Sequence, residues 1–119
     1  MPTATPDEIT FRGAIDRFRT IYHRFEQIEG RPWGAEGATI ELMKQVGELA
    51  KYVMVAERYY FVGREKLPGY AASKETIGDE LADIFAMLIR IADHYDIDLV
   101  EAHAKARQVE DEWLTARGM

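Results

Sequence analysis

The segment TIGDELADIFAMLIRIADHY, residues 76–95, decides the fold class of this 119-residue chain. Its large apolar side chains recur at steps of four and three residues, which is the spacing along one face of an α-helix: Ile77, Leu81, Ile84, Leu88, Ile91 and Tyr95. Strands would show β-branched residues in strict alternation instead, and no such pattern is found. The segment therefore predicts a helix that starts after Ser73, a suitable N-cap residue, and runs to about Tyr95.

The same periodicity predicts three further helices. The first covers about residues 7–29, with Pro6 and Asp7 suited to its start, and the second covers about residues 36–60. The fourth opens with Asp98, which is followed by Glu101 in a pair resembling a capping box, and continues to Trp113. Connections rich in glycine and proline separate the first three helices. We expect one all-α domain over residues 1–119, a four-helix bundle with mostly antiparallel neighbours.

Composition limits the classes of function. The formal net charge is −6, which argues against a general binder of polymeric nucleic acid because neutralising phosphates needs a basic surface. The chain has no cysteine, so disulfides and thiolate metal sites are excluded. The opening residues MPTATPDEIT lack the features of a secretory signal, and no apolar run has the length of a membrane span. We therefore expect a cytoplasmic protein without a membrane partner.

Two acidic residues stand out beside the apolar stripe of the helix at residues 73–95. Glu80 and Asp83 are three residues apart, so they lie on one face and repel each other by a few tenths of a kcal/mol. No lysine or arginine lies among the same-face positions around them. Two interpretations remain open: a solvated helix edge, which is common for charged residues, and a site for a cation.

The preceding helix repeats this spacing with Gln45 and Glu48. Lys44 and Lys51 flank Glu48, so an ordinary surface ion pair is the simpler interpretation of that residue alone. If the two helices pack side by side, however, Glu48 can meet the acidic pair, with Gln45 beside it. Oxygen ligands of this kind suit Mg²⁺, whereas the lack of cysteine and of Glu-x-x-His pairs disfavours zinc and di-iron sites.

The segments KQVGELAKYV and DELADIFAMLIRIADHYDIDLVEAHAKA resemble the MazG-like nucleoside triphosphate pyrophosphohydrolases, which belong to the all-α NTP pyrophosphatase superfamily. The resemblance covers residues 33–105. The family motif is Glu-x-x-Glu on one helix and Glu-x-x-Asp on a later one. Here the first half reads Gln45-Val46-Gly47-Glu48, and the second half reads Glu80-Leu81-Ala82-Asp83.

The resemblance implies an enzyme that cleaves a nucleoside triphosphate into a monophosphate and pyrophosphate, in the manner of nucleotide-pool cleaning. It implies Mg²⁺, with Mn²⁺ as a possible substitute, held by Glu48, Glu80, Asp83 and the amide oxygen of Gln45. Glu48 and Glu80 are the expected catalytic residues. The expected substrate-binding residues are an aromatic side chain near the base and cationic side chains near the phosphates: Trp33, Lys51, Arg90 and Lys105. The family also implies a homodimer or a dimer of dimers.

The chain departs from the family pattern at specific positions. Gln45 brings no negative charge, and Val109 and Glu112 stand where relatives often carry asparagine and arginine. These departures motivate an alternative, a degenerate homologue that binds nucleotide or a protein partner without turnover. A purely structural helical assembly module is a third possibility. A group of aromatic residues in the last part of the second helix and directly after it is expected at a subunit contact or a base pocket: Tyr52, Tyr59, Tyr60 and Phe61.

Overall fold

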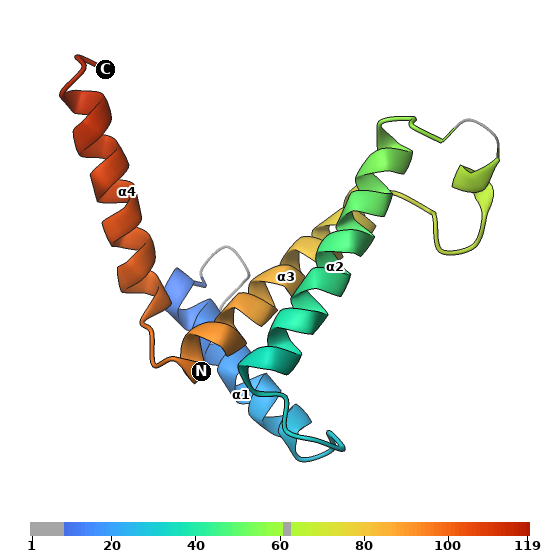
Figure 1. Cartoon of the computed structure of the whole chain (residues 1–119), viewed down its shortest axis with the longest axis horizontal. Helices are drawn as coiled ribbons and strands as arrows, with labels where there is room; N and C mark the ends of the chain where they lie inside the picture. Colours follow the sequence, from blue (N-terminus) through green and yellow to red (C-terminus); the bar gives the residue numbers. More distant parts are fainter. Residues whose placement is uncertain (1–8, 61–62) are drawn as a thin grey trace.

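The computed structural model describes residues 9–60 and 63–119, and this part of the chain contains helices and no strands (Figure 1). The all-α prediction is confirmed. Within these residues, none of the helices combines the length and the apolar character needed to cross a bilayer. The elements in chain order are α1 (Phe11–Glu26), α2 (Gly34–Ala56), a short 3₁₀ helix η2 (Arg64–Lys66), α3 (Lys74–His94) and α4 (Leu99–Thr115).

Side-chain caps fix where three of the helices begin. The Ser73 hydroxyl accepts a hydrogen bond from the Thr76 backbone N–H in a full capping box, and Asp98 accepts one from the Glu101 N–H at 3.1 Å. Both predicted caps are therefore confirmed. The first helix begins at Phe11, later than predicted, because the hydroxyl of Thr10 caps it. The predicted start at Pro6 and Asp7 lies outside the described residues.

Left-handed residues close two of the helices. After α2, Arg58 has φ 63°, its N–H donates to the Val55 carbonyl, and the Tyr59 N–H donates to the Met54 carbonyl at 2.9 Å. This is the hydrogen-bond pattern of a Schellman motif, so the predicted extension of this helix to Tyr60 is wrong. Asp96, with φ 53°, ends α3 in the same way.

The first helix also ends earlier than predicted, at Glu26 rather than Glu29. The Gln27 N–H turns back to the carbonyls of Arg24 and Phe25, and the chain then enters the segment that contains Gly30 and Pro32.

The helices pack in an unequal way. Figure 1 shows α2 and α3 as an antiparallel hairpin in contact along most of its length, while α1 crosses the C-terminal half of α3. The core of this crossing is Ile15, Tyr22 and Ile89, joined by Leu99 and Val100 from the start of α4. The rest of α4 projects away from α2 (Figure 1). Three helices thus pack together within the chain, and the hairpin positions the candidate site.

Candidate functional site

The two halves of the acidic motif lie on the two arms of the hairpin. Gln45 and Glu48 are on α2, and Glu80 and Asp83 are on α3. Because α2 packs against α3, residues distant in sequence come within electrostatic range of one another. This is the side-by-side packing of the two helices that the sequence-based prediction assumed.

Glu80 shows the effect of its acidic neighbours most clearly. Its pKa is raised above the ordinary value, first by burial and then by the negative charges of Asp83 and Glu48. Lys44 and Lys51 act in the opposite direction with smaller effects. The Oε2 atom of Glu80 is buried and has no hydrogen-bond partner. The charges of three acids on two helices therefore interact, and nearby lysines compensate them only in part.

Glu48 points its carboxylate to a cation on its own helix. Its Oε2 lies 2.8 Å from the Lys51 ammonium, which also sits about 5 Å from the ring centroids of Tyr52 and Tyr70. This hydrogen bond with Glu48 is the main reason that the pKa of Lys51 is raised. Among residues 9–60 and 63–119, no three histidine, cysteine or acidic side chains come close enough together to hold a metal ion.

Gln45 has a different environment from the acids. The residue is buried, its Nε2 donates a 3.4 Å hydrogen bond to a carboxylate oxygen of Glu41, and its Oε1 has no partner. Glu41 in turn pairs with Lys44 at 2.8 Å. The carboxamide thus belongs to the wall of a cavity next to the acidic group.

This cavity has a volume of about 410 Å³ and lies between α1 and the hairpin. It brings together four of the predicted site residues, Trp33, Gln45, Asp83 and Arg90, and its remaining wall is largely apolar. Its size falls in the range of small-molecule sites, roughly 300–1,000 Å³. Trp33, which was predicted to lie near a base, forms part of this wall.

Arg90 is more enclosed than a phosphate donor needs to be. Its side chain is 8% exposed, it pairs with Glu29 at 3.4 Å, and its guanidinium carbon lies 4.5 Å from the ring centroid of Trp33 and 5.0 Å from that of Tyr22. Its Nε is buried without a partner. The cation therefore holds the aromatic wall of the cavity in place.

The remaining predicted residues lie elsewhere. Lys105 is on α4, which projects away from α2, so one chain does not bring this lysine to the acidic group (Figure 1). Tyr60 packs edge-on against Tyr70 at 5.8 Å and carries Arg64 over its ring, while Tyr59 is exposed. Phe61 lies outside the described residues.

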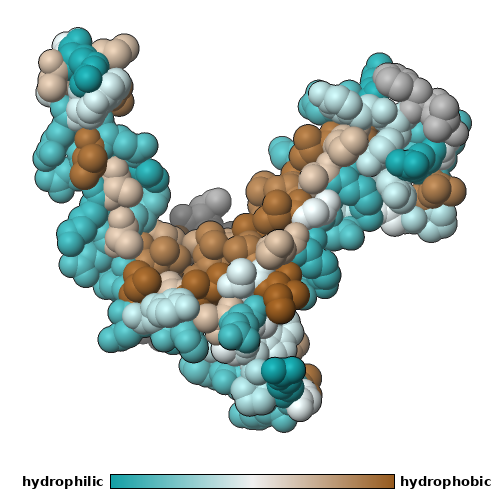
Figure 2. Space-filling view, viewed as in Figure 1, coloured by the Kyte–Doolittle hydropathy of each residue, from teal (hydrophilic) through white to brown (hydrophobic). Residues whose placement is uncertain are grey.

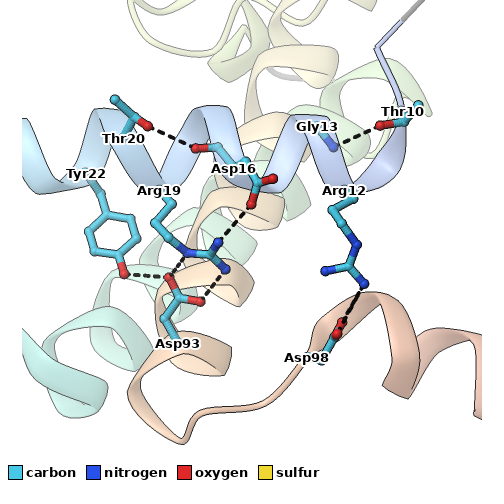
Figure 3. A network of polar contacts seen from close by, with 9 residues as sticks. All are labelled: Thr10, Arg12, Gly13, Asp16, Arg19, Thr20, Tyr22, Asp93 and Asp98. Atoms are coloured by element: carbon cyan, nitrogen blue, oxygen red, sulfur yellow. Dashed lines mark hydrogen bonds and ion pairs between the residues drawn. The ribbon is translucent and has the colours of Figure 1, made fainter.

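A second polar group, formed by Arg19, Tyr22 and Asp93, was not predicted from the sequence. The Arg19 guanidinium donates two hydrogen bonds to Asp93, at 2.8 and 2.9 Å, and the Tyr22 hydroxyl donates a third at 2.5 Å (Figure 3). These bonds, with that of Arg19 foremost, hold the pKa of Asp93 below its ordinary value. Burial and then the Asp93 hydrogen bond raise the pKa of Tyr22 to about 12.

The only sequence signal for this group is that Arg19 and Tyr22 share a helix face. Their partner Asp93 is more than 70 residues away. The group ties α1 to the end of α3 and borders a polar cavity of about 470 Å³. All its charges are paired with one another, which fits a structural role.

Comparison of the chain with models of protein families, with curated proteins and with solved structures returned no match.

Proposed function

We propose that this chain hydrolyses a nucleoside triphosphate to a nucleoside monophosphate and pyrophosphate at the acidic group formed by Glu48, Glu80 and Asp83. The supporting observation is the raised pKa of Glu80, whose causes include the charges of both other acids. An acidic group of this kind, left partly uncompensated between two helices, favours a cation or a proton. The MazG-like motif pattern in the sequence points to the same residues.

The donor set suits one kind of metal site. Mg²⁺ is usually held by one or two carboxylates together with substrate phosphates, and seldom by a cage made of protein alone. Glu80 and Asp83 offer two carboxylates one helical turn apart, and an oxygen of Glu80 lacks a partner. This arrangement fits Mg²⁺ or Mn²⁺ shared with a nucleotide. Such an ion would supply charge neutralisation at the phosphates.

The two catalytic candidates differ in their surroundings. Glu48 is engaged by Lys51, whereas Glu80 has a free oxygen and a raised pKa, which makes it the stronger base. In this proposal Glu80 accepts a proton from a water molecule. The water oxygen bonds to the α-phosphorus, and the bond to the bridging oxygen breaks, so that pyrophosphate leaves with the electron pair. Lys51 provides a cation beside the acids for a phosphate oxygen.

In this proposal the nucleoside occupies the neighbouring cavity. Asp83 belongs both to the acidic group and to the wall of this cavity, which also contains Trp33. A base lying against Trp33 would extend its phosphates toward Glu80. Gln45 would then contribute a neutral amide to this wall. The functional unit in the proposal is a homodimer or a dimer of dimers, as in the family that the sequence resembles.

One observation favours the alternative, nucleotide binding without turnover. Gln45 replaces an acid of the motif and is buried against Glu41, and Glu48 is already neutralised by Lys51. Under this alternative, nucleotide and Mg²⁺ raise the melting temperature but no product forms.

The experiment is a panel of nucleoside triphosphates incubated with the purified protein and Mg²⁺ or Mn²⁺, with pyrophosphate release as the readout. Glu80→Gln should abolish release, while Asp79→Asn, at an exposed neighbouring position on the same helix, should retain it. A folded wild-type protein that binds nucleotide and releases nothing would support the alternative. Equal loss in both variants, or equal retention, would remove Glu80 from the proposed role.

A further inference from the structure

Trp33 forms part of the walls of three neighbouring cavities. The first is the cavity of about 410 Å³ that the proposed function assigns to the nucleoside, and Phe18 of α1 and Met87 of α3 also line it. A second cavity, of about 440 Å³, shares Trp33 and Glu41 with it, and a third, of about 320 Å³, shares Trp33 and Arg90. On the face shown in Figure 2, hydrophobic residues gather where these helices pack together. The orientation of the indole therefore decides where the nucleoside cavity ends and its neighbours begin.

The start of α2 determines where this indole lies. Trp33 is the N-cap residue of α2, and its side chain makes no capping hydrogen bond. Its carbonyl accepts the first hydrogen bond of the helix, from the Gly37 N–H at 2.9 Å. Side chains four residues apart on a helix are neighbours, so the Trp33 side chain lies over the first turn of α2, at Gly37.

Gly37 leaves the Trp33 side chain room that any other residue would fill. A β-carbon at Gly37 would lie 3.0 Å from Cβ and 3.2 Å from Cγ of Trp33, whereas carbon atoms pack at about 3.5–4.0 Å. Cβ and Cγ form the first bond of the side chain, so a motion at the far end of the ring cannot relieve this contact. Relief requires a different rotation about the Cα–Cβ bond, which would swing the whole indole. A β-carbon at Gly47, on the same helix, would meet nothing within 4 Å.

Arg90 holds the same ring from α3. Its guanidinium carbon lies 4.5 Å from the ring centroid of Trp33, and the Arg90 side chain is itself fixed by an ion pair with Glu29 at 3.4 Å. The indole is thus held by the first turn of α2 and by a buried cation of α3. The wall that it forms has a defined orientation before any ligand binds.

We propose that Gly37 is a positioning residue of the ligand site, which acts through Trp33. Because Gly37 has no side chain, the indole takes the orientation that separates the nucleoside cavity from the cavity beside it. The wall so formed limits which ring systems the cavity accepts, so Gly37 influences specificity without touching the ligand. The inference rests on the proposed function for the nature of the ligand, whereas the contact between Gly37 and Trp33 can be measured without one.

Thermal unfolding tests the contact. Gly47→Ala should raise the melting temperature by about 4 °C, because alanine favours a helix and the added methyl group meets nothing. Gly37→Ala should lower the melting temperature, because its methyl group collides with Trp33. In a Trp33→Ala background the same change at Gly37 should raise the melting temperature, as it does at Gly47. This double variant also removes the collision if Gly37→Ala alone does not fold.

Fluorine NMR tests the orientation of the ring and its effect on binding. The chain has two tryptophans, so Trp113→Phe protein labelled with fluorotryptophan gives a single signal, from Trp33. Gly37→Ala should shift this signal and Gly47→Ala should not. Uridine and adenosine are the probes. Gly37→Ala should weaken the preferred nucleoside about tenfold, the effect of a small misfit in a pocket, and should bring the two dissociation constants closer together. In a protein that releases pyrophosphate, KM should rise with kcat unchanged, because the acidic group is untouched.

Three results would overturn the inference. One is a Trp33 signal that Gly37→Ala leaves unchanged. Another is a signal that moves while both dissociation constants stay at their wild-type values, and the third is a wild-type signal that responds to neither nucleoside. Nucleoside binding that depends on Gly37, in a protein that releases no pyrophosphate, would support this inference and contradict only the proposed function.

Discussion

Replacing Asp93 by asparagine tests the polar group that ties α1 to α3. The carboxylate is 18% exposed and accepts three hydrogen bonds, two from Arg19 and one from Tyr22. An asparagine keeps the shape but loses the charge, and each hydrogen bond to a charged group is worth about 1 kcal/mol more than a neutral one. Because Arg19 is 41% exposed, solvent reduces the sum, and we expect a loss of about 2 kcal/mol.

Thermal unfolding measures this loss. For a chain of 119 residues, 1 kcal/mol corresponds to a shift in the melting temperature of about 4 °C, so Asp93→Asn should lower it by about 8 °C at pH 7. Asp16→Asn is the matched control. Asp16 also contacts Arg19, at 2.8 Å, but it is exposed, so its loss should cost less than about 0.5 kcal/mol.

The stability that Asp93 contributes should depend on pH in a definite direction. The pKa of Asp93 is lowered in the folded protein, so its contribution is present above the ordinary pKa of aspartate and disappears as the pH falls through the lowered value. The difference between wild type and Asp93→Asn should therefore shrink in strong acid. Equal effects of the two asparagine variants, or a difference that persists unchanged at low pH, would refute this account of the network.

Four further substitutions test other parts of the structure by thermal or chemical unfolding. Tyr22→Phe should cost about 1 kcal/mol at pH 7, a difference that should disappear as the pH rises from 10 through about 12, where the wild-type phenol ionises. Glu80→Gln should stabilise the protein by up to about 0.5 kcal/mol at pH 7 and by less in acid, since the raised pKa means that wild-type Glu80 binds its proton more readily when folded. Arg90→Met should cost about 3 kcal/mol because it leaves Glu29 unpaired, and adding Glu29→Gln should restore part of the loss; additive effects would contradict the pairing. Arg58→Gly should stabilise by about 1 kcal/mol, because glycine adopts the left-handed conformation without strain.

The sequence predicted the helices better than their ends. Apolar spacing gave all four helices, and side-chain chemistry identified the caps Ser73 and Asp98, since both signals are local. The end of α2 was missed because the left-handed residue there is Arg58, where the usual glycine signal is absent. The helix ends there through backbone hydrogen bonds, and the residue types do not indicate them.

The sequence predicted which acidic residues share a helix face, but not which side chains pair with one another. Spacing placed Glu80 and Asp83 on one face, and the packing of α2 on α3 brought Glu48 into range. The sequence could not show that Arg90 would form an ion pair with Glu29, which is 61 residues away. This pairing depends on the loop between α1 and α2, because that loop sets where Glu29 lies relative to α3.

The two surfaces of the hairpin explain why a small chain keeps so much apolar area exposed. Two packed helices leave a surface on each side of their contact. Here one side carries the acids and the cavity, while the other carries exposed apolar residues such as Leu81 and Val46. Covering both sides within one chain would bury carboxylates such as Glu80 that already lack full compensation, which costs several kcal/mol for each unpaired charge. Placing α1 over only the end of α3 leaves the acids open to ligand and water.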